Sequence, residues 1–178
     1  MLKGSRSKTT NEGFESILST QLKTGDFIKL FRDQMAPCDI LLLHSSEKYL
    51  RNYVAYCETS ANDGSVTYQM KKCLLNTSNS KMHRGDFNNM KLSLNGHIQY
   101  SHPSANHNNF EAFLKLRNDP KVQDAGRDNL LVKGSNLKNS WVVGLVLYVG
   151  TDCKPVARGD AHHFQRESTS YLENKLNG

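Results

Sequence analysis

The side chains most able to bind a metal or act as nucleophiles are seven histidines and four cysteines. Three histidines, His97, His102 and His107, recur every five residues, and His162 and His163 are adjacent. A zinc site needs about four converging ligands. A spacing of five follows neither one helical face nor one strand face, and neighbours on a strand point to opposite sides. We therefore interpret these histidines as solvated loop residues.

The cysteines also lack the spacing of a metal site. Cys38, Cys57, Cys73 and Cys153 include no C-x-x-C pair, so an intracellular chain is expected to carry them as four unbridged thiols. The sequence contains neither a G-x-x-x-x-G-K-[ST] phosphate loop nor an Asp-Lys-Thr-Gly phosphorylation motif. We therefore expect this stretch alone neither to bind ATP strongly nor to be phosphorylated.

A tight turn is predicted where an apolar segment, residues 54–59, meets Ala-Asn-Asp-Gly at 61–64. Asn, Asp and Gly tolerate positive φ, which makes this composition typical of turns. Asp63, Gly64 and Ser65 therefore follow a predicted strand directly.

The elements around this turn are predicted to be mainly β. Short apolar bursts separated by turn residues begin at Phe14, which is typical of a β-rich domain. The clearest predicted strands cover residues 27–30, 40–43, 54–59, 129–132 and 141–149, and two apolar islands, 90–100 and 110–116, are further candidates. After Phe164, apolar residues recur about every three to four positions, which predicts one C-terminal helix. The expected fold is a distorted, jelly-roll-like β-sandwich with this helix.

The domain boundaries follow from composition. Residues 1–13 are predicted to be a disordered lead, and residues 14–177 a single domain. An Asn- and His-rich stretch at about 76–126 is predicted to be a mobile insertion. No apolar run approaches the ~20 residues that a membrane span requires.

The formal net charge of +6 raises the possibility of nucleic-acid binding. The 23 lysines and arginines are scattered, however, and they are not interleaved with stacking aromatics, so we favour a solvated basic surface and no nucleic-acid partner. A basic β-rich domain that binds nucleic acid remains the alternative, and a salt-dependent gel shift would separate the two.

Three stretches resemble the actuator domain of the type IV P-type ATPases, the phospholipid flippases. Residues 24–30 and 36–43, T-G-D-F-I-K-L and A-P-C-D-I-L-L-L, resemble the family's V-G-D-I-V-K-L and I-P-A-D-L-L-L-L. Residues 57–65, C-E-T-S-A-N-D-G-S, are similar to V-E-T-S-N-L-D-G-E. Residues 129–144, N-L-L-V-K-G-S-N-L-K-N-S-W-V-V-G, follow N-L-L-L-R-G-[CS]-x-L-R-N-T-x-W-V-x-G, and 148–154 and 172–177 continue the match. The middle, 76–127, has almost none.

This resemblance implies a role for the turn. In such pumps, ATP phosphorylates an aspartate on another domain, and the glutamate of the D-G-E-T loop positions and deprotonates the water that hydrolyses the phosphoenzyme. Asp63 and Gly64 match that loop, and they are expected in an exposed position, whereas Ser65 replaces the glutamate. A serine can orient water but is no base near neutral pH. The catalytic loop is therefore predicted to be degenerate, with reduced dephosphorylation and a regulatory role.

The resemblance also implies partners and a location. The parent is expected to be an ATP- and magnesium-dependent multi-pass membrane protein, with this domain at the cytosolic face and without a cofactor or metal of its own. Its partners would be the phosphorylation and nucleotide-binding domains and the membrane helices of the same chain. An accessory membrane subunit could be a further partner. An Asn-rich insertion beside a degenerate loop is similar to the flippase-like half of apicomplexan guanylyl cyclases, which make cyclic GMP; a divergent flippase is the other interpretation.

Overall fold

The centre of the fold is a pair of buried antiparallel strands, β4 (Asp39–Ser45) and β13 (Trp141–Tyr148). β13 is a nearly continuous apolar run and β4 has one at residues 40–43, as strands covered on both faces require. In the computed structural model, the described residues are 6–10, 13–59, 68–75, 95–103, 110–117, 120–153 and 168–171. They form a mainly β, sandwich-like domain, which confirms the predicted fold class.

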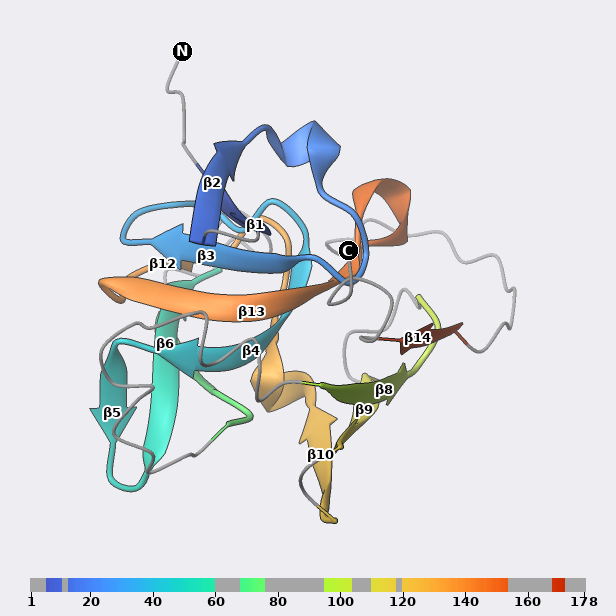
Figure 1. The fold of residues 1–178 in the computed structure, drawn as a ribbon. Coiled ribbons are helices and arrows are strands. Elements are labelled where there is room, and N and C mark those ends of the chain that lie inside the picture. The colour runs from blue at the N-terminus through green and yellow to red at the C-terminus, as the bar shows by residue number, and fades with distance from the viewer. Residues whose placement is uncertain are drawn as a thin grey trace, which may run out of the picture.

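These two strands belong to a six-stranded sheet with the order β11-β4-β13-β3-β1-β2. The other members are β1 (Arg6–Thr10), β2 (Gly13–Ile17), β3 (Phe27–Phe31) and β11 (Leu130–Leu131). Short 3₁₀ turns, η1 (Ser19–Gln21) and η5 (Gly150–Asp152), flank β3 and β13 in the sequence. In Figure 1, β3 and β13 run side by side, with β1 and β2 beyond β3.

A second sheet has the order β12-β6-β5, with β7 also paired to β6. It contains β5 (Glu47–Tyr49), β6 (Asn52–Glu58), β7 (Tyr68–Lys72) and β12 (Asn136–Leu137). A third sheet, β10-β9-β8-β14, contains β8 (Gly96–Tyr100), β9 (Glu111–Leu116), β10 (Val122–Gly126) and β14 (Ser168–Tyr171). The 3₁₀ turn η4 (Arg127–Asn129) connects β10 to β11. Figure 1 shows β5 and β6 at the lower left and the third sheet at the lower right.

One hydrophobic core joins the three sheets. Leu42, Ala55, Ile98 and Leu114, which come from β4, β6, β8 and β9, are each at most 2% exposed. The backbone after β7 runs along β4, where Leu74 and Leu75 donate N–H bonds to the carbonyls of Leu42 and Leu43 at 2.9 and 3.1 Å. The β6–β7 hairpin is thereby fixed to the central sheet.

The structure corrects three expectations. Arg6–Thr10, expected in a disordered lead, form β1, because polar residues gain ladder bonds between β2 and β3. Val122–Gly126, expected to be loop, form β10 because they pair in register with β9. Ser168–Tyr171, expected in a helix, form strand β14 at the edge of β8. The rest of the expected helix, and residues 76–94 and 104–109 of the insertion, lie outside the described residues.

The remaining predictions can be compared directly. The islands 90–100 and 110–116 yield β8 and β9, and the segment 141–149 yields the buried central strand β13. All four cysteines are buried and none forms a disulfide, which confirms the expected thiols. Among the described residues, no helix is long and apolar enough to cross a membrane.

Candidate functional site

The predicted site residues Asp63, Gly64 and Ser65 lie outside the described residues, but both strands that lead to them are described. β6 and β7 form an antiparallel hairpin whose last register pair is Glu58 with Tyr68. Residues 59–67 therefore connect the two strands at one end of β6, and the tight β5–β6 turn lies at the other end. We call residues 60–67 the candidate loop.

The strand that enters the candidate loop is held by a buried amide. Asn139 is fully buried; its Oδ1 accepts a hydrogen bond from the Tyr56 N–H at 2.5 Å, and its Nδ2 donates to the Val54 carbonyl at 2.8 Å. The Ser45 hydroxyl donates to the same carbonyl at 2.7 Å. Two side-chain donors thus match the two lone pairs of this carbonyl. Side chains from β4 and from residue 139 thereby fix the position of β6.

The last residue of β6 takes part in an ion-pair cluster. Lys138 Nζ lies 3.1 Å from a Glu58 carboxylate oxygen and 3.6 Å from an Asp33 carboxylate oxygen, and 5.9 Å from the centre of the Tyr68 ring. The hydrogen bond with Glu58 is the main reason that the pKa of Lys138 is raised. Partly exposed pairs of this kind stabilise little. The cluster therefore orients the ends of β6 and β7, between which the candidate loop runs, and adds little to the stability of the fold.

The turn before β12 joins two of the sequence motifs. The Ala36 N–H donates to the Ser135 carbonyl, and the Gly134 N–H donates to the Ala36 carbonyl, both at 2.8 Å. Gly134 has φ of +86°, a conformation that favours glycine. The buried Asp39 carboxylate accepts a hydrogen bond from the Lys133 N–H at 2.8 Å. The motif segments 36–43 and 129–144 are thus bonded to each other next to β6.

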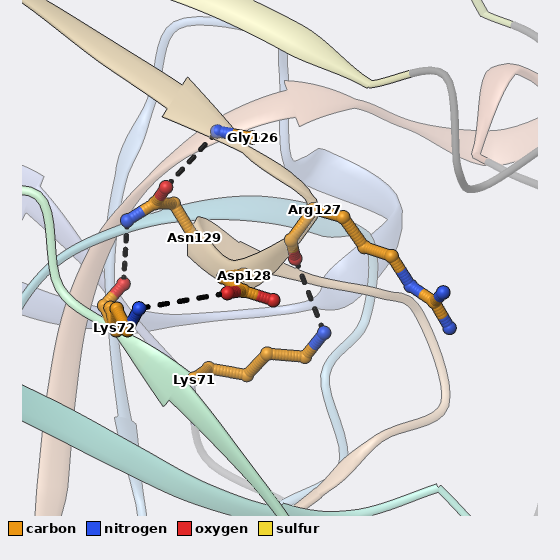
Figure 2. A network of polar contacts seen from close by, with 6 residues as sticks. All are labelled: Lys71, Lys72, Gly126, Arg127, Asp128 and Asn129. Atoms are coloured by element: carbon orange, nitrogen blue, oxygen red, sulfur yellow. Dashed lines mark hydrogen bonds and ion pairs between the residues drawn. The ribbon is translucent and has the colours of Figure 1, made fainter.

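A second network ties β7 to the 3₁₀ turn η4, which is itself bonded to the end of β10 (Figure 2). The buried Lys71 Nζ donates to the Arg127 carbonyl at 3.2 Å, and Lys72 Nζ lies 3.8 Å from Asp128 Oδ2. Asn129 Nδ2 donates to the Lys72 carbonyl, and Asn129 Oδ1 accepts from the Gly126 N–H, both at 3.0 Å. Both strands of the hairpin are therefore anchored on residues of the segment 126–139.

Burial changes the ionisation of two groups within the hairpin, Cys57 on β6 and Lys71 on β7. It lowers the pKa of Lys71 and raises the pKa of the Cys57 thiol to about 11. Because the thiolate is the reactive form of cysteine, a pKa this high makes Cys57 a poor nucleophile at neutral pH. The described part of this region can therefore position a loop, and Cys57 offers it no reactive nucleophile.

Sequence reasoning missed the anchoring residues Lys138, Asn139 and Asn129. All three belong to the third motif, so their place in a motif was the available signal. The hairpin residues that Asn129 and Asn139 bond lie 57–85 residues away in the sequence. Among the residues that the structure describes, no three His, Cys, Asp or Glu side chains gather as a metal site. Of the spaced histidines, His97 is exposed but lies in strand β8 and not in the expected loop, because it pairs in register with β9. His102 follows that strand, and His107, His162 and His163 lie outside the described residues.

Comparisons with known proteins agree with the motif resemblance. The chain is 35% identical over 135 residues, or 75% of its length, to the phospholipid-transporting ATPase tat-1 of Caenorhabditis elegans. It is 31% identical over 157 residues to human phospholipid-transporting ATPase IC, and 30% identical over 145 residues to guanylate cyclase alpha of Plasmodium falciparum. The matched regions cover 88% and 81% of the chain, respectively.

The relatives are much longer than this chain, which spans 11% of tat-1, 12% of the human ATPase and 3% of the Plasmodium cyclase. No protein-family model matches the chain. The resemblance to the type IV P-type ATPases that the sequence motifs indicated is confirmed by these similarities, and the chain is a flippase-like domain.

Proposed function

Since this chain corresponds to one segment of the phospholipid-transporting, type IV P-type ATPases, we propose that it is an actuator domain with a degenerate dephosphorylation loop. In the parent protein it would couple the state of a phosphorylated aspartate on another domain to movement of membrane helices. Its own contribution would be to carry Asp63, Gly64 and Ser65 to that aspartate.

The observation that carries this proposal is the anchoring of the β6–β7 hairpin. A loop that must meet another domain needs a fixed base, because misplacement of reacting groups by about 1 Å can cost 10²-fold in rate. Here Asn139 holds β6 and Asn129 holds β7, through hydrogen bonds of 2.5–3.0 Å. Two residues of the third motif therefore support the loop that carries the second motif.

The loop would act on a water molecule rather than on a covalent bond to this chain. Gly64 would allow close approach of the backbone to the phosphorylated site, because it has no Cβ. Ser65 would orient the attacking water through its hydroxyl, but no base would stand there to accept the proton. General-base assistance is worth about 10²–10⁴ in rate, so the phosphoenzyme of the parent would be long-lived.

A long-lived phosphoenzyme suits a regulatory role better than rapid transport. The similarity to a Plasmodium guanylate cyclase favours a parent in which the flippase-like part controls cyclase output. In either parent, ATP and magnesium would act on the phosphorylation and nucleotide-binding domains, and this domain would lie at the cytosolic face of the membrane.

Site-specific crosslinking in the full-length parent tests this proposal. A photo-crosslinking amino acid would replace Ser65, and the matched control would place it at Leu50, which is 83% exposed in the turn at the opposite end of β6. After ATP is added, the crosslinked peptides would be identified by mass spectrometry. We expect residue 65, and not residue 50, to crosslink to the phosphorylation domain in an ATP-dependent way. Equal crosslinking from both positions, or none from residue 65, would contradict the proposal.

A further inference from the structure

The third sheet carries a hollow that the proposed function does not use. It lies where β8 begins and β9 ends, has a volume of about 420 Å³, and includes Asn95, His97, Lys115 and Arg117 in its wall. β8 and β9 lie side by side at the lower right of Figure 1. In their register His97 is opposite Lys115, and the Arg117 N–H donates to the Asn95 carbonyl at 2.7 Å. The wall is therefore built on paired backbone.

The charge of this wall favours an anion. Ile98 and Leu114 are buried, so the alternation along β8 and β9 places His97 and Lys115 on the exposed face. Directly opposed residues of an antiparallel pair have their Cβ atoms about 4.5–5.5 Å apart. Arg117 adds a planar guanidinium that can form two parallel hydrogen bonds to one phosphate. Among the described residues that line the hollow, none is Asp or Glu.

A buried acceptor in the same wall points to a hydroxyl donor. Asn95 Oδ1 is buried and has no hydrogen-bond partner, and an unmade bond of this kind costs about 1–3 kcal/mol. The phosphate group of a monoester dianion offers acceptors alone, so a hydroxyl elsewhere on the ligand has to satisfy this oxygen. A ligand that carries both a phosphate and hydroxyl groups would match the cations and Asn95 together.

The volume agrees with a ligand larger than a phosphate ion. A hollow of about 420 Å³ lies within the range of roughly 300–1,000 Å³ that is common for small-molecule sites. One water molecule takes about 30 Å³ of liquid volume. A phosphate with a sugar- or inositol-sized ring therefore has room in this hollow.

We propose that the hollow between the start of β8 and the end of β9 binds the phosphate ester of a polyhydroxylated molecule. Lys115, Arg117 and His97 bind the phosphate, and Asn95 Oδ1 accepts a hydrogen bond from a ligand hydroxyl. A soluble sugar or inositol phosphate and the headgroup of an inositol lipid share this chemistry. The site is independent of the candidate loop.

Calorimetric titration of this chain tests the proposal. The soluble probes are inositol 1-phosphate, free inositol and inorganic phosphate. Because a lipid headgroup could also supply the ligand, a second set of titrations uses phosphatidylcholine vesicles with and without phosphatidylinositol 4-phosphate at about one lipid in twenty. The variant Lys115→Gln/Arg117→Gln removes two cations of the wall. Lys23→Gln/Arg32→Gln, two exposed cations outside the wall, is the charge-matched control. Asn95→Ala tests the hydroxyl contact.

We expect inositol 1-phosphate to bind more tightly than inorganic phosphate, and free inositol not to bind. The wall variant should weaken binding at least tenfold, Asn95→Ala should remove the preference for inositol 1-phosphate over phosphate, and the control should change binding less than twofold. Vesicle binding that soluble inositol 1-phosphate displaces would identify the lipid as a second source of the ligand. No binding of any probe, or equal loss in the wall variant and the control, would overturn the proposal.

Discussion

Replacing Asn139 with alanine should destabilise the domain far more than the loss of a surface amide would. The change removes two hydrogen bonds, from the Tyr56 N–H at 2.5 Å and to the Val54 carbonyl at 2.8 Å. Each bond contributes about 1 kcal/mol net, and the Tyr56 N–H left without a partner costs a further 1 kcal/mol or so. We therefore expect a loss of about 3 kcal/mol, which for a domain of this size lowers Tm by roughly 6–12 °C.

Ser45 provides a second, sharper test of the same contact. Its hydroxyl proton can serve the Val54 carbonyl at 2.7 Å or the Glu47 carbonyl at 2.9 Å. Ser45→Ala leaves Val54 bonded to Asn139, so it should cost only about 1 kcal/mol. The double variant leaves the Val54 carbonyl with neither donor, so its loss should exceed the sum of the single losses by about 1 kcal/mol.

Urea denaturation followed by the fluorescence of Trp141, the one tryptophan in the sequence, measures all of these variants. Ser140→Ala, next to Asn139 but exposed, is the control and should change stability by less than about 0.5 kcal/mol. If Asn139→Ala costs less than about 1 kcal/mol, or if the two substitutions are simply additive, then Asn139 does not hold β6 in the way described.

Three further outcomes are expected. Gly144→Ala should lower the urea midpoint by the equivalent of about 1–3 kcal/mol, because a Cβ there would lie 2.3 Å from Ile40 Cγ2 and 2.6 Å from the Leu41 carbonyl oxygen. Burial raises the pKa of the Cys73 thiol from 9.0 to about 12. Between these two values the folded state keeps a proton that the unfolded state loses. The free energy of unfolding should therefore fall between pH 9 and 12, by up to about 1.4 kcal/mol per pH unit. Cys73→Val should flatten that decline, and an unchanged pH profile would contradict this cause. In gel shifts at about 0.15 M salt the chain should not retard DNA or RNA; retardation whose log affinity falls with log salt would favour the nucleic-acid alternative.

The central strands could be predicted because their sequences alone require burial. β13 is apolar along nearly its whole length and β4 has a continuous apolar run at residues 40–43, so a strand buried on both faces is their most favourable state. β1 and β10 are polar or mixed, and their conformation depends on partners, β2 and β3 for one and β9 for the other. The spacing of the apolar residues after Phe164 (Tyr171, Leu172 and Leu176) indicated a helix. Ser168–Tyr171 nevertheless pair with β8, since tertiary pairing outweighs weak local periodicity.

The motif of the candidate site could be predicted from the sequence, but the contacts that hold its strands could not. The turn composition placed Asp63 and Gly64 after a strand, and β6 does end at Glu58. The sequence could not show that Asn139 contacts Tyr56 across 83 residues, because hydrogen bonds between distant segments leave no periodic signal. It also could not reveal that Asn95 and Arg117 meet at the end of a sheet, since the insertion offered only two short apolar islands.

The most direct test of the central claim is the decay of a radiolabelled phosphoenzyme in the full-length parent. Excess unlabelled ATP is added after labelling, and the decay of the labelled phosphoenzyme is compared among the wild type, Ser65→Glu and Ser65→Ala. Because the loop is proposed to lack its base, Ser65→Glu should speed decay, by up to the 10²–10⁴ that a general base provides, and Ser65→Ala should change it little. A large slowing in Ser65→Ala, with no gain in Ser65→Glu, would show that Ser65 itself sustains hydrolysis and that the loop is not degenerate.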